Sequence, residues 1–420
     1  MNEPRHNWAG NVAYASLRLH RPESVEEVQE IVARSRKVKA FGTRHSFNAI
    51  TDSSEDQISL EKMDQPLVYD ESSQRVTVSG GMSYSQLGAE LHRVGRAIHN
   101  FASFPHFTVA GAVSTATHGS GDANGNLATA VTGLEIVRAD GEIVTLSKEK
   151  DGDTFLGAVV SLGALGVVTR LTLETQPAFW MQQDIYENVP VSRIESHFDD
   201  LMSAAYSVSL FTDWQGDINE VWLKHRLPDE NGLPLPSTFL GGTLATRPLH
   251  PVAAFDAAPC TIQMGIPGPW HERLPHFRAE TEVVSGNELQ TEYFVARQHA
   301  PAALAVVAGL GDKLAGVLKI SEVRSMTGDN LWMSMAYGQD TIGIHFSWNF
   351  DLPAIARLMG ILEERLAPFA PRPHWGKLSS LPGSYVQAQY PKINDFRALA
   401  ERFDPNGKFR NGYLNEMVFA

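Results

Sequence analysis

A carboxylate and a guanidinium lie two residues apart in the segment Val317–Arg324, VLKISEVR. In a β-strand, alternate side chains point to opposite faces, so the two charged groups would share one face. That face would consist of Leu318, Ile320, Glu322 and Arg324. The charged groups would then either form a surface ion pair, worth ~0–1 kcal/mol, or hold a polar ligand together, and these residues alone favour the surface pair.

The segment Thr341–Phe350, TIGIHFSWNF, has the clearest alternation in the chain. It predicts a strand with one apolar and one polar face. The apolar face consists of Ile342, Ile344, Phe346 and Trp348, and the polar face of Gly343, His345, Ser347 and Asn349. If the polar face is solvated, His345 is an ordinary exposed histidine. If this strand lies beside Glu322 and Arg324, the polar side chains form a cluster large enough for a hydroxyl-rich ligand.

A glycine turn follows a short apolar run in Val38–Asn48, VKAFGTRHSFN, and His45 lies in that turn. The preceding segment, Ser24–Arg36, predicts an amphipathic helix, because Ser24 and Glu27 form an S-x-x-E capping box. Its apolar face consists of Val25, Val28, Ile31 and Val32. A helix, a buried strand and a tight glycine turn are a common way to present main-chain N–H groups to a phosphate. The alternative is an ordinary turn with a solvated histidine.

The segment Asn100–Asn126 is rich in Ala, Gly, Ser and Thr and contains no Lys, Arg or Glu. Small residues allow close backbone approach, and the hydroxyl and amide groups can bond a polar ligand. A flexible glycine-rich linker is the alternative. The interleaved Phe101, Phe104 and Phe107 disfavour it, because a linker has no use for apolar side chains.

Composition restricts the class of protein. A chain of 420 residues is long enough for two substantial domains, and its net charge of −13 disfavours nucleic acid or an anionic membrane as a partner. The single cysteine, Cys260, excludes an internal disulfide framework and is consistent with a reducing cytoplasm. The chain has no apolar run near the ~18 residues that span a bilayer, and its first residues lack the apolar core of a signal peptide.

The organisation of the chain changes after Pro177. Before it, strands and helices alternate, and Ala139-Asp140-Gly141 predicts a hairpin turn between Leu134–Arg138 and Glu142–Leu146. No G-x-G-x-x-G opens a helix after a strand, which counts against a Rossmann domain and NAD. Further strands are predicted at Val38–Phe41, Leu67–Asp70, Arg75–Ser79 and within Ser161–Thr175, and helices at Tyr84–Val94, Arg297–Leu310 and Leu352–Leu366. Leu227–Pro251 and Ala257–Pro275, rich in proline and glycine, are predicted to be surface loops.

The segments Val38–Asn48 and Asn100–Asn126 together resemble the flavin-binding domain of the vanillyl-alcohol-oxidase family, in which FAD lies along two glycine-rich stretches. Within that family, nearly the whole chain, from Asn7 to Lys377, is similar to the alditol (xylitol) oxidases. The resemblance is specific because all the matching stretches occur together and in the order in which the family has them. The matching stretches are NWAGNVAY, GTRHSFN, ASFPHFTVAGAVSTATHGSG, SLGALGVVT, AAYSVSLFTDW, PGPWHERLPHFRAE, SEVRS, IHFSW and RPHWGK.

The resemblance implies an α+β architecture, the two-domain vanillyl-alcohol-oxidase/PCMH-type FAD-binding fold with a substrate (cap) domain built on an antiparallel sheet. The expected boundaries are 1–178 for the FAD-binding domain and 179–372 for the cap domain. Residues 373–420 would return to the FAD domain. The implied activity is oxidation of the terminal primary alcohol of linear polyols to the aldose, with O2 reduced to H2O2.

The resemblance also implies a set of flavin contacts along both segments. His45 corresponds to the histidine that is bonded covalently to the 8α position of the flavin ring in this subfamily. Arg44 is a departure, because glycine is more common at that position. The other implied contacts are Ala40, Phe41, Gly42, Thr43, Arg44, Ser46, Ser103, Thr108, Gly111, Ala112, Ser114, Thr115, His118, Gly119, Val168 and His374.

The substrate site implied by the resemblance lies where the E-x-R strand and the H-F-S strand meet. Lys377 and Arg324 would stabilise the developing alkoxide, and His345 is the candidate general base. Ser103, Glu322 and Ser347 would bind the remaining hydroxyls, although threonine is more usual at the position of Ser347. The expected enzyme is a cytoplasmic monomer with covalent FAD that acts on a polyol and O2 and uses no metal. A sugar-lactone oxidase or dehydrogenase of the same superfamily, and a flavin- or sugar-binding protein without turnover, are the alternatives.

Overall fold

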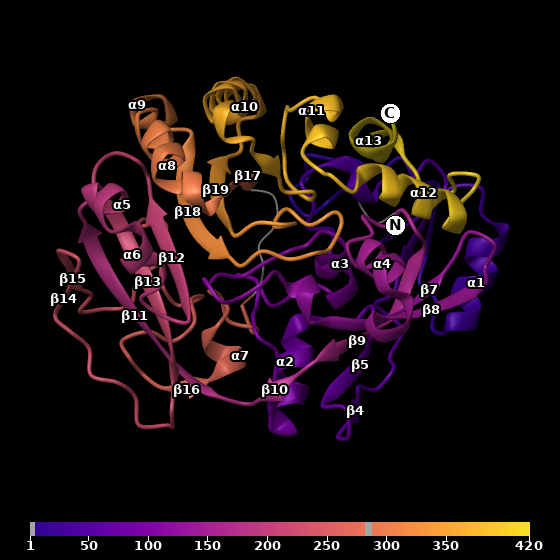
Figure 1. The fold of residues 1–420 in the computed structure, drawn as a ribbon, viewed down its shortest axis with the longest axis horizontal. Coiled ribbons are helices and arrows are strands. Elements are labelled where there is room, and N and C mark those ends of the chain that lie inside the picture. Colours follow the sequence, from indigo (N-terminus) through magenta and orange to yellow (C-terminus); the bar gives the residue numbers. More distant parts are fainter. Residues whose placement is uncertain (1–4, 282–287) are drawn as a thin grey trace.

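Two antiparallel sheets dominate the structure, one in each half of the chain (Figure 1). The computed structural model describes residues 5–281 and 288–420. The sheet of the N-terminal half has the strand order β4-β5-β9-β7-β8. Its strands are β4 (Val68–Asp70), β5 (Arg75–Ser79), β7 (Val131–Val137), β8 (Ile143–Ser147) and β9 (Val167–Glu174). The predicted hairpin is confirmed, because β7 and β8 pair antiparallel on either side of the Ala139-Asp140-Gly141 turn.

A small parallel sheet lies beside the N-terminal sheet and carries the glycine turn at its end. It consists of β1 (Arg18–His20), β3 (Asp56–Ser59) and β2 (Val38–Phe41), and β6 (Arg96–Ala97) pairs separately with β10 (Gln176–Pro177). The helices of this half are α1 (Val25–Arg34), η1 (Ala49–Thr51), α2 (Tyr84–Arg93), α3 (Val109–Ser114), η2 (Leu127–Ala130) and α4 (Lys148–Val159). Helix α1 begins as predicted, since the Ser24 hydroxyl accepts the N–H of Glu27 at 3.2 Å.

The larger sheet, with ten strands, forms the other half (Figure 1). Its order is β14-β15-β11-β13-β12-β18-β19-β17-β20, with β16 also paired to β11. The strands are β11 (Trp180–Val189), β12 (Ser207–Thr212), β13 (Ile218–Leu227), β14 (Thr238–Phe239), β15 (Gly242–Leu244), β16 (Gly268–Pro269), β17 (Glu288–Ala296), β18 (Leu318–Met326), β19 (Thr341–Asn349) and β20 (Arg372–Pro373). The helices are α5 (Ser192–Ser196), α6 (Phe198–Met202), α7 (Trp270–Arg273), η3 (Arg297–His299), α8 (Ala300–Ala308), α9 (Gly311–Leu314), α10 (Leu352–Leu366) and η4 (Ala367–Phe369).

The two faces of this sheet differ in what they bury. One row, Val323–Ile344–Tyr293, is apolar and faces the helices, since the Tyr293 hydroxyl donates to Glu363 of α10 at 2.9 Å. The opposite row contains Glu322 and His345 and faces the N-terminal half. The predicted alternation of β19 is therefore confirmed.

The predicted face of β18 is wrong at its first residue. A bulge between Leu318 and Ile320 shifts the register, so Leu318 pairs with Trp348 on the apolar side, while Ile320 pairs with Ser347 on the polar side. Directly opposed residues in an antiparallel pair share a face. One inserted residue therefore separates Leu318 from the charged row, and alternation alone could not indicate it.

The two predicted surface loops are also wrong in part. Residues 227–251 contain β14 and β15, which extend the large sheet, and residues 257–275 contain β16 and α7. Trp270 of α7 is fully buried against Phe101 and Phe179, at ring-centroid distances of 5.3 and 6.0 Å. Short edge strands and a one-turn helix carry too little periodicity for their sequence to distinguish them from loops.

The C-terminal helices lie over the N-terminal half (Figure 1). They are α11 (Gly383–Ala388), α12 (Ile393–Phe403), α13 (Gly412–Leu414) and η5 (Asn415–Phe419). The Lys408 ammonium donates to the carbonyl of Ala139 at 2.6 Å, and the buried Asp404 carboxylate accepts the N–H groups of Lys408 and Phe409 at 2.7 Å. One hydrophobic cluster extends from Ala9 to Val418 and includes residues of both halves. Within the described ranges, no helix has the length and apolarity needed to cross a membrane.

We predict that Gly88→Ala in α2 destabilises the protein, contrary to the helix propensities of the two residues. A Cβ at Gly88 would lie 2.9 Å from both His271 Cβ and Phe101 Cζ, where α7 packs on α2. Overpacking of this kind costs about 1–3 kcal/mol. Gly360→Ala in α10 is the matched control, since its Cβ would meet nothing within 4 Å, and it should gain about 0.5–1 kcal/mol. Urea unfolding of both variants measures the difference, and equal stabilisation by both would contradict the packing.

Candidate active site

A cavity of about 850 Å³ lies between the two halves. One wall is the glycine turn and the segment after Phe101, and the other is the polar row of the large sheet. The predicted site residues that line it are Ala40, Phe41, Gly42, Thr43, Arg44, His45, Ser46, Ser103, Thr108, Gly111, Ala112, Ser114, Thr115, His118, Val168, Glu322, Arg324, His345, Ser347, His374 and Lys377. The structure therefore brings together residues that are more than 300 positions apart in the chain.

Gly119 is the exception among the predicted site residues, because it lies behind the cavity wall. A Cβ there would come within 2.1 Å of Asn100 Oδ1 and 2.2 Å of the Phe101 carbonyl oxygen. Glycine is therefore required at this position by packing. Gly119 does not line the cavity, and its predicted contact with the flavin stays a prediction.

Strands β18 and β19 are neighbours, as the substrate-site expectation required. Glu322 pairs with His345, and Ile320 pairs with Ser347. On the far side of β19, His345 is opposite Glu292 and Ser347 is opposite Gln290 of β17. The polar side chains thus form a continuous row across three strands on the cavity side.

Glu322 is held from two directions. His276 Nε2 lies 2.7 Å from Glu322 Oε1, and Arg324 Nε lies 3.5 Å from the same oxygen. Burial alone would raise the pKa of Glu322, but Arg324 and His276 outweigh it and hold the pKa below its usual range. Glu322 is therefore ionised at neutral pH and acts as a hydrogen-bond acceptor.

Lys377 and Arg324 converge on one buried carboxylate, Glu292. Lys377 Nζ donates to Glu292 Oε2 at 2.6 Å, and Arg324 Nη2 donates to Oε1 at 3.0 Å. Arg324 Nη1 also donates to the Ser103 hydroxyl at 3.3 Å. Burial lowers the pKa of Lys377, and Glu292 opposes that change. These contacts place two cations on one carboxylate at the cavity wall.

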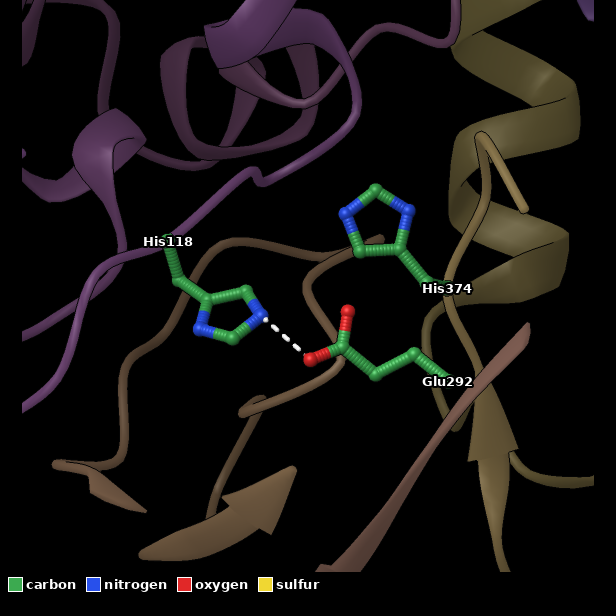
Figure 2. Close-up of side chains that lie close together, drawn as sticks. All are labelled: His118, Glu292 and His374. Atoms are coloured by element: carbon green, nitrogen blue, oxygen red, sulfur yellow. Dashed lines mark hydrogen bonds and ion pairs between the residues drawn. The ribbon is translucent and has the colours of Figure 1, made fainter. Parts of the chain in front are cut away.

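Figure 2 shows Glu292 between His118 and His374. The ligand atoms of the three side chains lie within 4.8 Å of one another, a spacing compatible with a metal ion. However, both carboxylate oxygens already accept hydrogen bonds from Arg324 and Lys377, and His374 Nδ1 accepts the N–H of Gly376 at 3.0 Å. The positive charges of Arg324 and Lys377 lie against the one carboxylate of this three-residue group and repel a further cation. The three side chains are therefore a poor ligand set for a metal ion.

His345 is neutral at neutral pH and has free ring nitrogens. Burial, together with the charge of Lys377, lowers its pKa to about 3. Neither Nδ1 nor Nε2 has a hydrogen-bond partner among the described residues. Beside it, the Ser347 hydroxyl donates to Glu288 Oε1 at 3.2 Å. A neutral imidazole next to two cations suits a ligand that both donates and accepts hydrogen bonds, such as an alcohol.

His45 stacks on Trp8, with ring centroids 4.2 Å apart. Burial, with smaller contributions from Lys377 and His106, lowers its pKa to about 3, and its buried Nε2 has no hydrogen-bond partner among the described residues. The preceding residue, Arg44, has φ 60°, and its carbonyl accepts the N–H of Trp8 at 2.7 Å. Arg44 thus adopts the left-handed conformation that glycine prefers, so the departure at this position does not prevent the turn.

The cavity fits FAD in size and in the character of its walls. Its volume is at the upper end of the ~300–1,000 Å³ typical of ligand sites, which suits a dinucleotide together with a small substrate. Gly42 allows the glycine turn to lie directly against Thr108, because a Cβ would lie 2.1 Å from Thr108 Oγ1. The glycine turn and the segment that contains Thr108 therefore pack directly against each other and form one wall of the cavity, with the neutral His45 among its side chains.

The sequence prediction missed Glu292, His276, Glu288 and Gln290. A signal for three of them exists in ELQTEYFVA, residues 288–296, where Glu288, Gln290 and Glu292 alternate with apolar or β-branched residues. A carboxylate such as that of Glu292, in the middle of a strand that continues with Tyr293, Phe294 and Val295, indicates a buried polar partner. His276 lies in an irregular segment, where no periodicity could indicate its direction.

Two family models match the chain. The first describes an FAD binding domain and matches residues 17–147, and the second describes D-arabinono-1,4-lactone oxidase and matches residues 287–417. Among curated relatives, alditol oxidase from a Streptomyces species is 44% identical over 416 residues, covering 98% of each chain. L-gulono-1,4-lactone dehydrogenase from Mycobacterium tuberculosis is 29% identical over 430 residues, again covering 98% of each chain.

Solved structures share the fold at low sequence identity. A solvent-stable cholesterol oxidase superposes with a TM-score of 0.78 at 14% identity, covering 98% of this chain and 97% of the other. Glucooligosaccharide oxidase from Acremonium strictum, described with a 6-S-cysteinyl, 8α-N1-histidyl FAD, superposes with a TM-score of 0.76 at 14% identity, covering 99% and 94%. The α+β FAD-binding fold with an antiparallel cap sheet is thereby confirmed.

We predict that Arg44→Val lowers the free energy of unfolding by about 1–2 kcal/mol, because a β-branched residue is strained in the left-handed region. Gln74→Val is the matched control, since Gln74 also has a positive φ, 55°, in an exposed turn that does not line the cavity. Both variants should lose stability in denaturant titrations, but only Arg44→Val should also weaken FAD binding. Full stability of Arg44→Val would mean that the turn has another backbone path.

Proposed function

This chain belongs to the alditol oxidases of the vanillyl-alcohol-oxidase flavoprotein family, and on that premise we propose that it oxidises the terminal primary alcohol of linear polyols to the aldehyde of an aldose. The chain is an FAD-dependent oxidoreductase that uses O2. The proposed balance is one alcohol and one O2 consumed for one aldehyde and one H2O2 formed. Xylitol and sorbitol are the proposed substrates.

The observation that carries this proposal is the group of Lys377, Arg324 and neutral His345 in the wall of the cavity. A primary alcohol must lose its hydroxyl proton as the hydrogen on C1 leaves with two electrons. Lys377 and Arg324 would donate hydrogen bonds to the alcohol oxygen and stabilise its developing negative charge. Such donors contribute most where water is excluded, and both side chains are largely buried.

His345 is the proposed acceptor of the hydroxyl proton. Its low pKa keeps it neutral and able to accept, and its ring nitrogens are free of protein partners. Burial beside two cations disfavours the imidazolium, so the proton would be held only briefly before it passes on. Stabilisation of the alkoxide by Lys377 and Arg324 therefore has to accompany the proton transfer.

Ser103, Glu322 and Ser347 would select a linear polyol by binding its remaining hydroxyl groups. The Ser103 hydroxyl lies beside Arg324, while Glu322 and Ser347 lie further along the polar row. A hydrocarbon alcohol has no further hydroxyls to bond to these groups, so it would forgo hydrogen bonds worth about 0.5–1.5 kcal/mol each. Serine keeps the hydroxyl that threonine supplies in relatives, so the position remains a hydrogen-bonding one.

FAD, held along the glycine turn and residues 103–118, would supply the two-electron acceptor for this oxidation. The proposed link to the protein is a covalent bond from His45, a neutral buried imidazole. The Acremonium oxidase carries a second, cysteinyl link. Here the only cysteine, Cys260, is buried beside Trp222 and does not line the cavity, so the proposal is for a single link.

The single reduced cysteine also supports the proposed cytoplasmic location, and a monomer is proposed from the family.

The second candidate activity is oxidation of a sugar lactone. It is favoured by the lactone-oxidase model that matches residues 287–417. An aldonolactone also carries a primary alcohol, so the polyol is preferred on similarity: alditol oxidase is 44% identical over 98% of the chain, whereas L-gulono-1,4-lactone dehydrogenase is 29% identical over the same share.

We predict that the purified protein consumes O2 with xylitol or sorbitol at a kcat/KM at least about tenfold higher than with aldonolactones, a difference of about 1.4 kcal/mol. Lys377→Met should lower kcat/KM for xylitol by about 10²–10³-fold, because one donor to the developing alkoxide is lost. Lys313→Met, at an exposed position on α9, is the matched control and should retain activity. Faster turnover of a lactone than of any polyol would favour the second candidate.

We predict that flavin fluorescence stays with the polypeptide after denaturation in acid or SDS, and that His45→Ala releases it. His106→Ala is the matched control, since His106 lines the same cavity and should leave the flavin attached. Flavin released from the unaltered protein would show that the cofactor is bound without a covalent link. Flavin retained by His45→Ala would assign the link to another residue.

A further inference from the structure

Glu292 is the most enclosed charged residue of the site. It lies in the middle of β17, opposite His345 of β19, and its side chain has no exposed surface. An unpaired carboxylate in such a position would be costly, so its ionisation depends on its neighbours. Their identities indicate what Glu292 does.

Three groups from separate parts of the chain contact the Glu292 carboxylate. Oε1 lies 3.0 Å from Arg324 Nη2 and 3.1 Å from His118 Nε2, and Oε2 lies 2.6 Å from Lys377 Nζ. Arg324 comes from the cap sheet, His118 from the N-terminal half (Figure 2), and Lys377 from the segment after β20. One carboxylate therefore fixes the position of Lys377 relative to Arg324 at the cavity wall.

Gly343 makes this arrangement sterically possible. It lies on β19 directly opposite Arg324, between that residue and β17. A Cβ at Gly343 would lie 3.2 Å from Glu292 Oε1 and 3.0 Å from Phe294 Cε1. The missing side chain thus leaves the space through which the Glu292 carboxylate reaches across β19 to Arg324.

We infer that Glu292 is a positioning residue for the proposed oxidation, one that aims the Lys377 ammonium and the Arg324 guanidinium at the alcohol oxygen and keeps the ammonium charged. The inference rests on the proposed function. Glu292 itself does not need to touch the substrate, because its oxygens are already occupied by the groups that do.

The balance of charge around Lys377 explains how Glu292 keeps the Lys377 ammonium charged. Glu292 and Glu322 form one linked group with Arg324 and Lys377, and within this group two negative charges balance two positive charges. Burial lowers the pKa of Lys377, Arg324 lowers it further, and Glu292 is the larger of the opposing carboxylate contributions. The titratable and charged groups that surround the Glu292–Lys377 pair are His45, His118, Glu322, Arg324, His345 and His374.

Without the charge of Glu292, Lys377 would lose its proton at lower pH. Removal of an adjacent opposite charge typically shifts a pKa by about 1–3 units. Glu292→Gln keeps the size of the side chain and removes the charge. Glu292→Asp keeps the charge but shortens the side chain by one methylene. Comparison of the two variants therefore separates the effect of the carboxylate charge from its effect on the positions of Lys377 and Arg324.

Glu363→Gln is the matched control for a purely structural effect. Glu363 is also buried, and it accepts a hydrogen bond from Tyr293, the residue next to Glu292, on the opposite face of β17. It does not line the cavity. Its replacement should lower stability without a change in the titration of Lys377.

The test is a pH titration of the visible absorption of the bound flavin, without substrate, from about pH 5 to about pH 10. For Glu292→Gln we expect the midpoint on the basic side to fall by about 1–3 pH units, and the basic limb of kcat/KM for xylitol to fall with it. Glu292→Asp should return the midpoint to within about half a unit of the unaltered protein, while kcat stays at least about tenfold lower. Glu363→Gln should leave both unchanged.

A midpoint for Glu292→Gln equal to that of the unaltered protein, or no titration in either protein, overturns the inference. Equal shifts in Glu292→Gln and Glu363→Gln overturn it as well, because the effect would then be general to the sheet. The absorption titration needs no substrate. A failure of the unaltered protein to oxidise polyols would therefore contradict the proposed function without deciding the role of Glu292 in the charge of Lys377.

Discussion

Buried charge is the constraint on which the rest of this structure depends. The central strands of the large sheet, β17, β18 and β19, have no solvated face, because helices cover one side and the N-terminal half with residues 245–277 covers the other. Any charged side chain on the polar row must therefore find an opposite charge inside the protein. The structure meets this requirement with two linked pairs, Glu322 with Arg324 and Glu292 with Lys377, connected through the contact of Arg324 with Glu292. The same pairing that makes the sheet stable leaves two cations at the cavity wall.

This constraint also explains the unusual state of the histidines. His45, His118, His345 and His374 all line the cavity, and burial lowers the pKa of each. A neutral imidazole can both donate and accept a hydrogen bond, whereas a charged one can only donate. Lysine and arginine thus carry the positive charge of the site, and the histidines remain available for covalent attachment or for proton transfer.

Local patterns predicted the parts of the fold that depend on neighbours in sequence. Helix α1 has a capping residue and a regular apolar face, and β19 alternates without interruption, so both lie where the sequence placed them. Leu318 was misplaced because a bulge shifts the pairing of β18 by one residue, and no local signal marks it. Glu292 was missed for a different reason. Its partners are 32, 85 and 174 residues away, and only the assembled sheet brings them together. Family resemblance supplied the adjacency of β18 and β19, which a single sequence cannot.

The shared hydrophobic core restricts how ligands exchange with solvent. Because one apolar cluster continues from the N-terminal half through the cap to the C-terminal helices, rotation of one half away from the other would separate packed core side chains. Trp270, buried against Phe101, is one of the contacts that such an opening would break. Opening of the two halves about a hinge therefore has a high free-energy cost. Ligands would enter and leave the cavity through local motion of its wall. His250, Pro251, Val252, Phe255 and Pro259 line the cavity, and Phe255 is half-exposed, so this surface segment is a part of the wall that can move without separating the two halves.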